Sequence, residues 1–159
     1  MKITILGLGN SVLTDDAVGL KIAERVEQLL PEYPLPDGWS TEVCFDEAGG
    51  WEILNYVEGA DILFLVDSIL DEKLGPGELS WYPKKVFTSP RMCGVHNTDI
   101  FSAMKFAQKQ GLKVPEDLHI LGVGVDDVQT FSEDCTPKVT ACIEPAARQI
   151  LDKMVEIAV

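Results

Sequence analysis

The sequence predicts an α/β fold: a three-layer α/β/α sandwich around a twisted, mostly parallel sheet of about five strands. First, strand-like and helix-like segments alternate along the chain, which is typical of this class. Second, residues 61–69 form a nearly continuous apolar run, which indicates a strand covered by helices on both faces. Third, the chain opens with an apolar strand that runs directly into Gly7-Leu8-Gly9, a common start of such sheets.

Aliphatic and β-branched residues mark five expected strands, at residues 2–7, 41–46, 61–69, 79–82 and 119–125. Apolar residues at spacings of three and four mark the expected helices, which run from Asp15 or Asp16 to Leu30, over 52–57, over 98–110 and from Pro137 onward. Local signals support these ends, because Pro31 stops the first helix, Gly111 closes the third and Thr136 suits the N-cap of the last. Pro145 falls inside the last helix and is expected to kink it.

Length and composition predict one domain over residues 1–159, without an internal repeat, a low-complexity tract or a linker. The 26 acidic residues outnumber the 13 basic ones and give a net charge of −13. Such a surface repels phosphate backbones, so nucleic acid is not an expected partner. No apolar run is long enough to span a membrane and no signal peptide is evident, so we expect a cytoplasmic protein with reduced cysteines. No heptad pattern or isolated apolar patch indicates self-association, so we expect a monomer.

The glycine turn after the first strand does not suit a nucleotide. Gly7-Leu8-Gly9-Asn10-Ser11-Val12 lacks the third glycine of the dinucleotide fingerprint and the Lys-Ser/Thr of a P-loop. Asp15 and Asp16 would also place negative charge beside the phosphates. One of the two can cap the following helix, the simpler role for Asp15, and the other then faces the edge of the sheet. The turn therefore indicates a cation site.

Two further polar residues are expected at the same edge, because ligands bind at the carboxyl ends of parallel strands. Asp67 lies near the end of the most apolar strand, and His96 lies in the loop before the third helix. Two carboxylates and an imidazole suit a borderline divalent metal and leave coordination positions open for water or substrate. The alternatives are a structural Asp67 bonded to loop amides and a solvent-exposed loop histidine.

The order of these motifs resembles the [NiFe]-hydrogenase maturation endopeptidases over nearly the whole chain. Shared features are Gly7-Leu8-Gly9-Asn10 followed by Asp15-Asp16 and Gly19, the acidic-glycine motif Asp46-Glu47-Ala48-Gly49-Gly50, Asp67 at the end of a buried strand, His96 before a helix and Pro145 in the last helix. No single motif is specific, but the combination is.

The resemblance implies an endopeptidase that removes the C-terminal extension of a [NiFe]-hydrogenase large-subunit precursor after nickel insertion. The precursor would be its partner, and the nickel, replaceable by other divalent metals, would arrive with that precursor. Family roles carry over to Asp16, Asp67 and His96 as both the nickel-contacting and the catalytic residues.

The resemblance also implies a substrate-facing turn formed by Gly7, Gly9, Asn10, Asp46, Glu47 and Gly49. The sequence departs from the family at two places. Asp16 stands where Glu is common, which shortens the reach by a methylene, and Gly49-Gly50-Trp51 replaces a Thr-containing segment. Either Asp46 or Glu47 fills the acidic role of that second motif.

The expected reaction is attack of water on the peptide carbonyl, with the water activated by the metal or by Asp16 or Asp67 as general base. Two alternatives remain open. A thiol hydrolase would use Cys93 with His96 and would be blocked by alkylating reagents. A nickel-binding chaperone of hydrogenase assembly would bind the precursor without cutting it.

Overall fold

The structure, a computed structural model, describes residues 1–47, 50–82 and 100–159. It contains a five-stranded sheet with the strand order β2-β1-β3-β5-β4, in which β4 alone runs antiparallel to its neighbour. The strands are β1 (Lys2–Leu8), β2 (Ser40–Asp46), β3 (Ile62–Ile69), β4 (Leu79–Tyr82) and β5 (Asp117–Gly124), and the helices are α1 (Val18–Leu29), α2 (Leu54–Val57), α3 (Ile100–Lys109) and α4 (Pro137–Ala158). The predicted fold class is confirmed.

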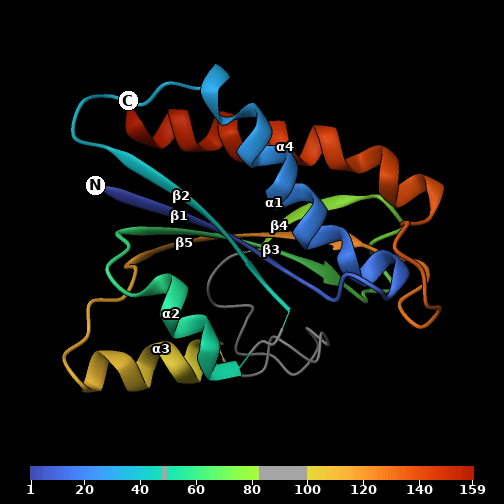
Figure 1. The fold of residues 1–159 in the computed structure, drawn as a ribbon, viewed down its shortest axis with the longest axis horizontal. Coiled ribbons are helices and arrows are strands. Elements are labelled where there is room, and N and C mark those ends of the chain that lie inside the picture. Colours follow the sequence, from blue (N-terminus) through green and yellow to red (C-terminus); the bar gives the residue numbers. More distant parts are fainter. Residues whose placement is uncertain (48–49, 83–99) are drawn as a thin grey trace.

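Helices cover both faces of the sheet, so the molecule has three layers (Figure 1). On one face, Ile5 and Phe64 pack with Ile22 of α1 and Ile150 of α4 in one buried cluster. On the other face, a second cluster joins alternate strand residues to α3 and to the segment around α2; it includes Leu6, Leu65, Val57, Ile100 and Met104. All eight residues of β3 are buried, as expected for a central strand between two apolar layers.

The chain reverses its direction of sheet growth between β1 and β3. After β1 it crosses through α1 to β2 at one edge, and β3 then returns to the opposite side of β1. In open α/β sheets, ligands bind at the carboxyl ends of the strands beside such a reversal. The loop after β1, which carries Asp16, and the end of β3, which carries Asp67, therefore lie at the position favoured for ligand binding.

Some predicted elements differ in detail. The first helix does not begin at Asp15 or Asp16, because a 3-10 turn (Thr14–Ala17) precedes α1. The expected helix over 52–57 is a 3-10 turn (Gly50–Ile53) followed by the short α2. Helix α4 continues through Pro145 to Ala158. Pro145 lies on the exposed side of α4, where water can bond the carbonyl that lacks an amide partner.

No helix among the described residues is long and apolar enough to cross a bilayer.

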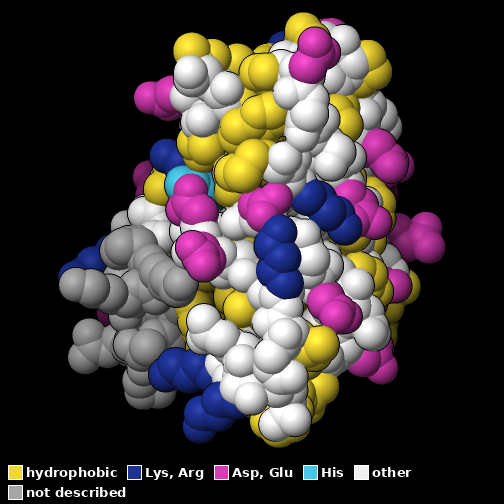
Figure 2. All heavy atoms as spheres, turned by 90° about the vertical axis from the view of Figure 1, so that its left-hand side faces the viewer, with side chains coloured by type: hydrophobic (Ala, Val, Ile, Leu, Met, Phe, Trp, Pro, Cys, Tyr) yellow, Lys and Arg dark blue, Asp and Glu magenta, His cyan; other side chains and the backbone are white. Residues whose placement is uncertain are grey.

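Figure 2 shows the side of the molecule toward which both chain ends point, with hydrophobic side chains gathered in its upper part and acidic and basic side chains interspersed across the middle. Lys113 and Asp61 form one surface ion pair (Nζ–Oδ1 2.5 Å). The carboxyl ends of the parallel strands lie on the opposite side.

Two glycines let α1 pack directly on the sheet. A Cβ on Gly7 would meet the carbonyl of Gly19 and the Cβ of Ala23, and a Cβ on Gly19 would lie 2.6 Å from the carbonyl oxygen of Val66 and closer still to that of Leu8. Backbone cannot move away as a flexible side chain can. The start of α1 is thus fixed against β1 and β3 by the absence of side chains.

Gly19→Ala is expected to destabilise the protein by about 3 kcal/mol, because the new methyl group must displace the backbone of β1 or β3. Chemical denaturation followed by circular dichroism measures this change. Gly75→Ala is the matched control, since its Cβ would approach only the side chain of Glu78, at 3.3 Å, and should change stability by less than about 0.5 kcal/mol. Equal effects at the two positions would contradict the packing argument.

Candidate active site

Asp16 and Asp67 lie together at the carboxyl edge, joined by Ser68. The Ser68 hydroxyl donates to Oδ1 of Asp16 at 3.0 Å, while the Ser68 backbone amide donates to Oδ1 of Asp67 at 2.8 Å. Asp67 is buried, with 1% of its surface exposed, whereas Asp16 is partly exposed. The arrangement offers a solvent-accessible carboxylate backed by a buried one, which suits a general base or a pair of oxygen ligands.

Asp15 has a different function from Asp16. It is fully buried and accepts hydrogen bonds from the backbone amides of Asp126 and Asp127 at 3.0 Å each and from that of Thr136 at 2.7 Å. The Thr136 hydroxyl lies 2.9 Å from both carboxylate oxygens. The expectation that Asp15 caps the helix that follows it is wrong, because its carboxylate instead joins the loop after β1 to the loop before α4.

The same two loops are linked by backbone contacts. The Thr14 amide donates to Ser132 (3.0 Å), the Ser132 amide donates to Val12 (3.0 Å), and the Asp15 amide donates to Asp127 (2.9 Å). Thr14 adopts a positive φ of 47°, a conformation that a β-branched residue rarely takes without tertiary support. The backbone next to Asp16 is therefore fixed by residues more than 100 positions away.

The predicted substrate-facing turn is partly buried. Gly7 lies beneath α1, and Gly9 is also buried. A Cβ on Gly9 (φ +156°) would collide with the Asp16 carbonyl. The Gly9 amide donates to Asp46 O at 3.2 Å, and Asp46 is buried at the end of β2. Asn10 is partly exposed. Gly9 thus allows β1 to approach the backbone of the site carboxylate.

Of the two acids in the second motif, Glu47 is the exposed one. Its Oε1 accepts from the Ser11 amide at 2.7 Å, and hydrogen bonds from the Ser11 hydroxyl and amide lower the pKa of the Glu47 carboxyl. The loops after β1 and β2 therefore meet at this edge.

Several predicted residues cannot be placed. His96, Cys93 and Gly49 lie outside the described residues, as does the whole segment 83–99 before α3, which includes the loop expected at 84–97. Within the described residues, no group of three His, Cys, Asp or Glu side chains has a geometry that could hold a metal. A three-ligand site would thus need a residue outside this part of the chain or one supplied by a substrate.

The placed cysteines do not resemble nucleophiles. Burial raises the pKa of the Cys135 and Cys142 thiols to about 11, so both are protonated at neutral pH. Burial also raises the pKa of Cys44. His119, the second histidine, stacks on Phe64 in the sheet with ring centroids 4.8 Å apart. These residues contribute to packing.

Sequence reasoning missed the roles of Ser68 and Thr136. Ser68 follows Asp67 directly, and a serine after a strand-end aspartate is a weak signal that its hydroxyl contacts another loop. Thr136 was expected to cap α4, and it does stand at the N-cap position. However, its hydroxyl bonds Asp15, 121 residues away, and local patterns do not report such contacts.

The fold and the paired carboxylates define a class: α/β proteins with an acidic site at the reversal point of a mostly parallel sheet. Comparison with known proteins narrows this class. A family model described as hydrogenase maturation protease matches residues 26–153. The chain belongs to the hydrogenase maturation protease family, and it is a peptidase.

Individual relatives agree with this assignment. The hydrogenase 2 maturation protease of Escherichia coli (strain K12) is 32% identical over 168 aligned positions, covering 100% of this chain and 94% of the relative. The solved structure of the hydrogenase maturating endopeptidase HybD from E. coli superposes with a TM-score of 0.79 at 31% identity, covering 98% and 93% of the two chains. The [NiFe] hydrogenase maturation protease HybD from Thermococcus kodakarensis shares the fold at 24% identity, with a TM-score of 0.70 and coverages of 98% and 99%.

Asp15→Ala is expected to reduce stability by about 3 kcal/mol, because it leaves three partly buried backbone amides and the Thr136 hydroxyl without their acceptor. Urea denaturation measures the loss. Asp134→Ala is the control, since Asp134 is an exposed aspartate of the same loop and should change stability by less than about 0.5 kcal/mol. If Asp15→Ala does not fold, Asp15→Asn should show a smaller loss in the same direction. A wild-type stability for both Asp15 variants would contradict this role.

Proposed function

We propose that this peptidase removes the C-terminal extension of a [NiFe]-hydrogenase large-subunit precursor once nickel has been inserted. The observation that carries the proposal is the pairing of Asp16 with Asp67 through Ser68 at the reversal point of the sheet. Membership of the hydrogenase maturation protease family supports the reaction type and the kind of substrate. It also favours an enzyme over a non-catalytic nickel chaperone.

Recognition of the nickel would use Asp16, Asp67 and His96, with the metal presented by the substrate. Two carboxylate oxygens and an imidazole nitrogen suit nickel and other divalent metals of similar preference. Asp16 is the accessible member of the pair and would make the first contact, while the buried Asp67 would complete it as the substrate closes over the edge. Nickel would thereby report that the precursor is ready for cleavage.

Peptide hydrolysis requires a deprotonated water near the scissile carbonyl. A carboxylate can accept the proton, and the accessible Asp16 is the better placed of the two, with its orientation set by the Ser68 hydroxyl. The substrate-borne metal can instead lower the pKa of a bound water. We expect the reaction to take place in the cytoplasm, with the protease acting as a monomer.

The proposal predicts nickel-dependent cleavage. Mass spectrometry of a nickel-loaded large-subunit precursor should show loss of a C-terminal peptide after incubation with the protease, and the nickel-free precursor should keep its mass. Asp16→Asn, Asp67→Asn and His96→Ala should each lower the rate by about 100-fold or more. Asp126→Asn, which changes an exposed carboxylate near the same edge, should retain the wild-type rate.

Each outcome of that experiment has a distinct meaning. Cleavage of the nickel-free precursor at the same rate would contradict nickel recognition but not protease activity. A stable complex with an unchanged precursor mass would favour the chaperone. Wild-type cleavage by Asp16→Asn or His96→Ala would remove these residues from the proposed site.

Ser68→Ala tests the positioning of Asp16 separately. Loss of the hydroxyl removes a hydrogen bond that orients the Asp16 carboxylate, so kcat should fall roughly tenfold while KM changes little. Thr4→Val is the matched control, because it also removes a buried strand hydroxyl, and it should leave kcat unchanged. Equal kcat values for the two variants would show that Ser68 does not position the carboxylate.

A further inference from the structure

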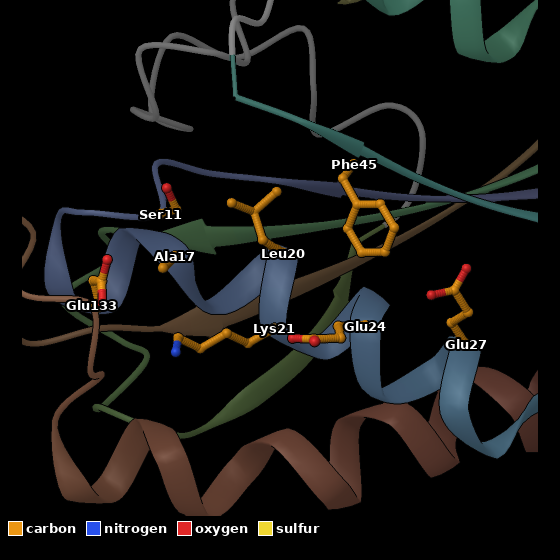
Figure 3. Close-up of a pocket in the computed structure, with 8 residues that line it drawn as sticks. All are labelled: Ser11, Ala17, Leu20, Lys21, Glu24, Glu27, Phe45 and Glu133. Carbon is orange, nitrogen blue, oxygen red and sulfur yellow. The ribbon is translucent and has the colours of Figure 1, made fainter.

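A shallow groove of about 490 Å³ runs beside the candidate site, between α1 and the end of β2. In Figure 3, Ser11 and Glu133 lie at one end of it, Phe45 faces α1 across the middle, and Glu24 and Glu27 follow toward the other end. The volume falls within the roughly 300–1,000 Å³ typical of ligand sites.

The groove combines an apolar floor with an acidic rim. Leu20 of α1 and Phe45 of β2 both line the groove (Figure 3), and Phe45 is 38% exposed. Glu24, Glu27 and Glu133 are exposed at the rim. Among the described residues that line the groove, Lys21 is the only base, and it extends toward the end where Glu133 lies. The half that contains Glu24 and Glu27 is therefore negative.

The groove is continuous with the candidate site. Ser11 lines the groove, and its amide donates to Glu47 at the exposed edge of the second motif. Ala17, which also lines it, directly follows Asp16 in the 3-10 turn. Among the described residues, the groove lining thus includes Ala17, the next residue along the chain from Asp16, and Ser11, which bonds the second motif.

The charge and the floor limit what can occupy this groove. Carboxylates on the rim repel phosphates, nucleotides and anionic lipid surfaces. A second copy of this chain is also unfavourable, because each copy carries a net charge of −13. An exposed aromatic ring beside Leu20 favours apolar side chains. The complementary ligand is an extended peptide that carries both Lys or Arg and apolar residues.

We propose that the α1–β2 groove binds a basic, partly apolar segment of the precursor adjacent to the scissile bond, a role that rests on the proposed function. From Ala17 to Glu27 the helical rise amounts to about 15 Å. An extended peptide rises by about 3.3 Å per residue, so the groove accommodates about four or five residues. Binding here would select the precursor by its charge pattern as well as by its metal.

The test reverses two charges at the rim. Glu24→Lys/Glu27→Lys should raise KM for the nickel-loaded precursor roughly tenfold at low ionic strength, with kcat unchanged, because exposed charges act mainly on encounter and docking. The difference from wild type should shrink in 0.5 M salt, because the Debye length there is about 4–5 Å and exposed charges farther apart are screened. The control is Asp152→Lys/Glu156→Lys, which makes the same change in net charge at exposed positions of α4.

A second readout does not depend on cleavage. Two synthetic pentapeptides, Lys-Leu-Lys-Leu-Lys and Glu-Leu-Glu-Leu-Glu, with blocked ends, are titrated into the isotopically labelled wild-type protein. Amide shifts at Leu20, Glu24 and Phe45 should respond to the basic peptide at concentrations at least about tenfold lower than to the acidic one. The groove variant should lose this preference, and the α4 variant should keep it.

The outcomes separate the two proposals. If wild type leaves the precursor uncut but the basic peptide still shifts the groove amides, the proposed function fails while the preference of the groove for basic peptides stands. If wild type cleaves the precursor and the groove and α4 variants have equal KM values, the groove proposal is overturned. Equal responses to the two peptides would overturn it as well.

Discussion

The structure of the candidate site depends on the buried carboxylate of Asp15. Three backbone amides and one hydroxyl from the segment between β5 and α4 converge on it. A buried carboxylate is costly unless donors compensate for the lost hydration. Here the donors are backbone groups of a loop and a helix start, which would otherwise also need partners. The carboxylate and the loop therefore stabilise each other, and neither is stable in this form alone.

This constraint separates two neighbouring aspartates that are chemically alike. Asp15 faces inward to the loop before α4, whereas Asp16 is partly exposed and accepts from Ser68 at the end of β3. Because the 3-10 turn is anchored through Asp15 and packed on Gly9, the direction of the Asp16 side chain is set before any ligand arrives. Such preorganisation lowers the entropic cost of binding and of reaction. The glycines and the acids of the first motif thus act together: the close backbone approach and the buried Asp15 orient the partly exposed carboxylate of Asp16.

The sequence was sufficient for the fold because the signals there are local. Apolar periodicity placed all five strands within two residues of their observed bounds and correctly indicated a buried central strand at residues 61–69. The start of the first helix was misplaced because an aspartate before an apolar helix normally serves as a cap, and a partner on a distant loop overrode that preference. Asp16 and Asp67 could be assigned to one edge from strand order alone. Their link through Ser68 could not, since it depends on side-chain directions that no spacing rule specifies.

The groove lay beyond sequence reasoning for a related reason. Its apolar lining combines Leu20 of a helix with Phe45 of a strand, two residues that only the fold brings to one groove. Its acids belong to a chain with many carboxylates, and solubility alone explains such an excess. Glu24 and Glu27 indicate a ligand preference only because the fold places them along this groove. A substrate that carries a divalent metal and a basic segment meets negative charge at the site and again along α1, so both contacts act in the same direction during encounter. Under the proposed function, a precursor without its metal would lose the contact at the carboxylate pair and keep only the groove, whose exposed charges bind weakly. Discrimination between loaded and empty precursor would then arise from the coupling of a weak, general contact to a specific one at the preorganised Asp16.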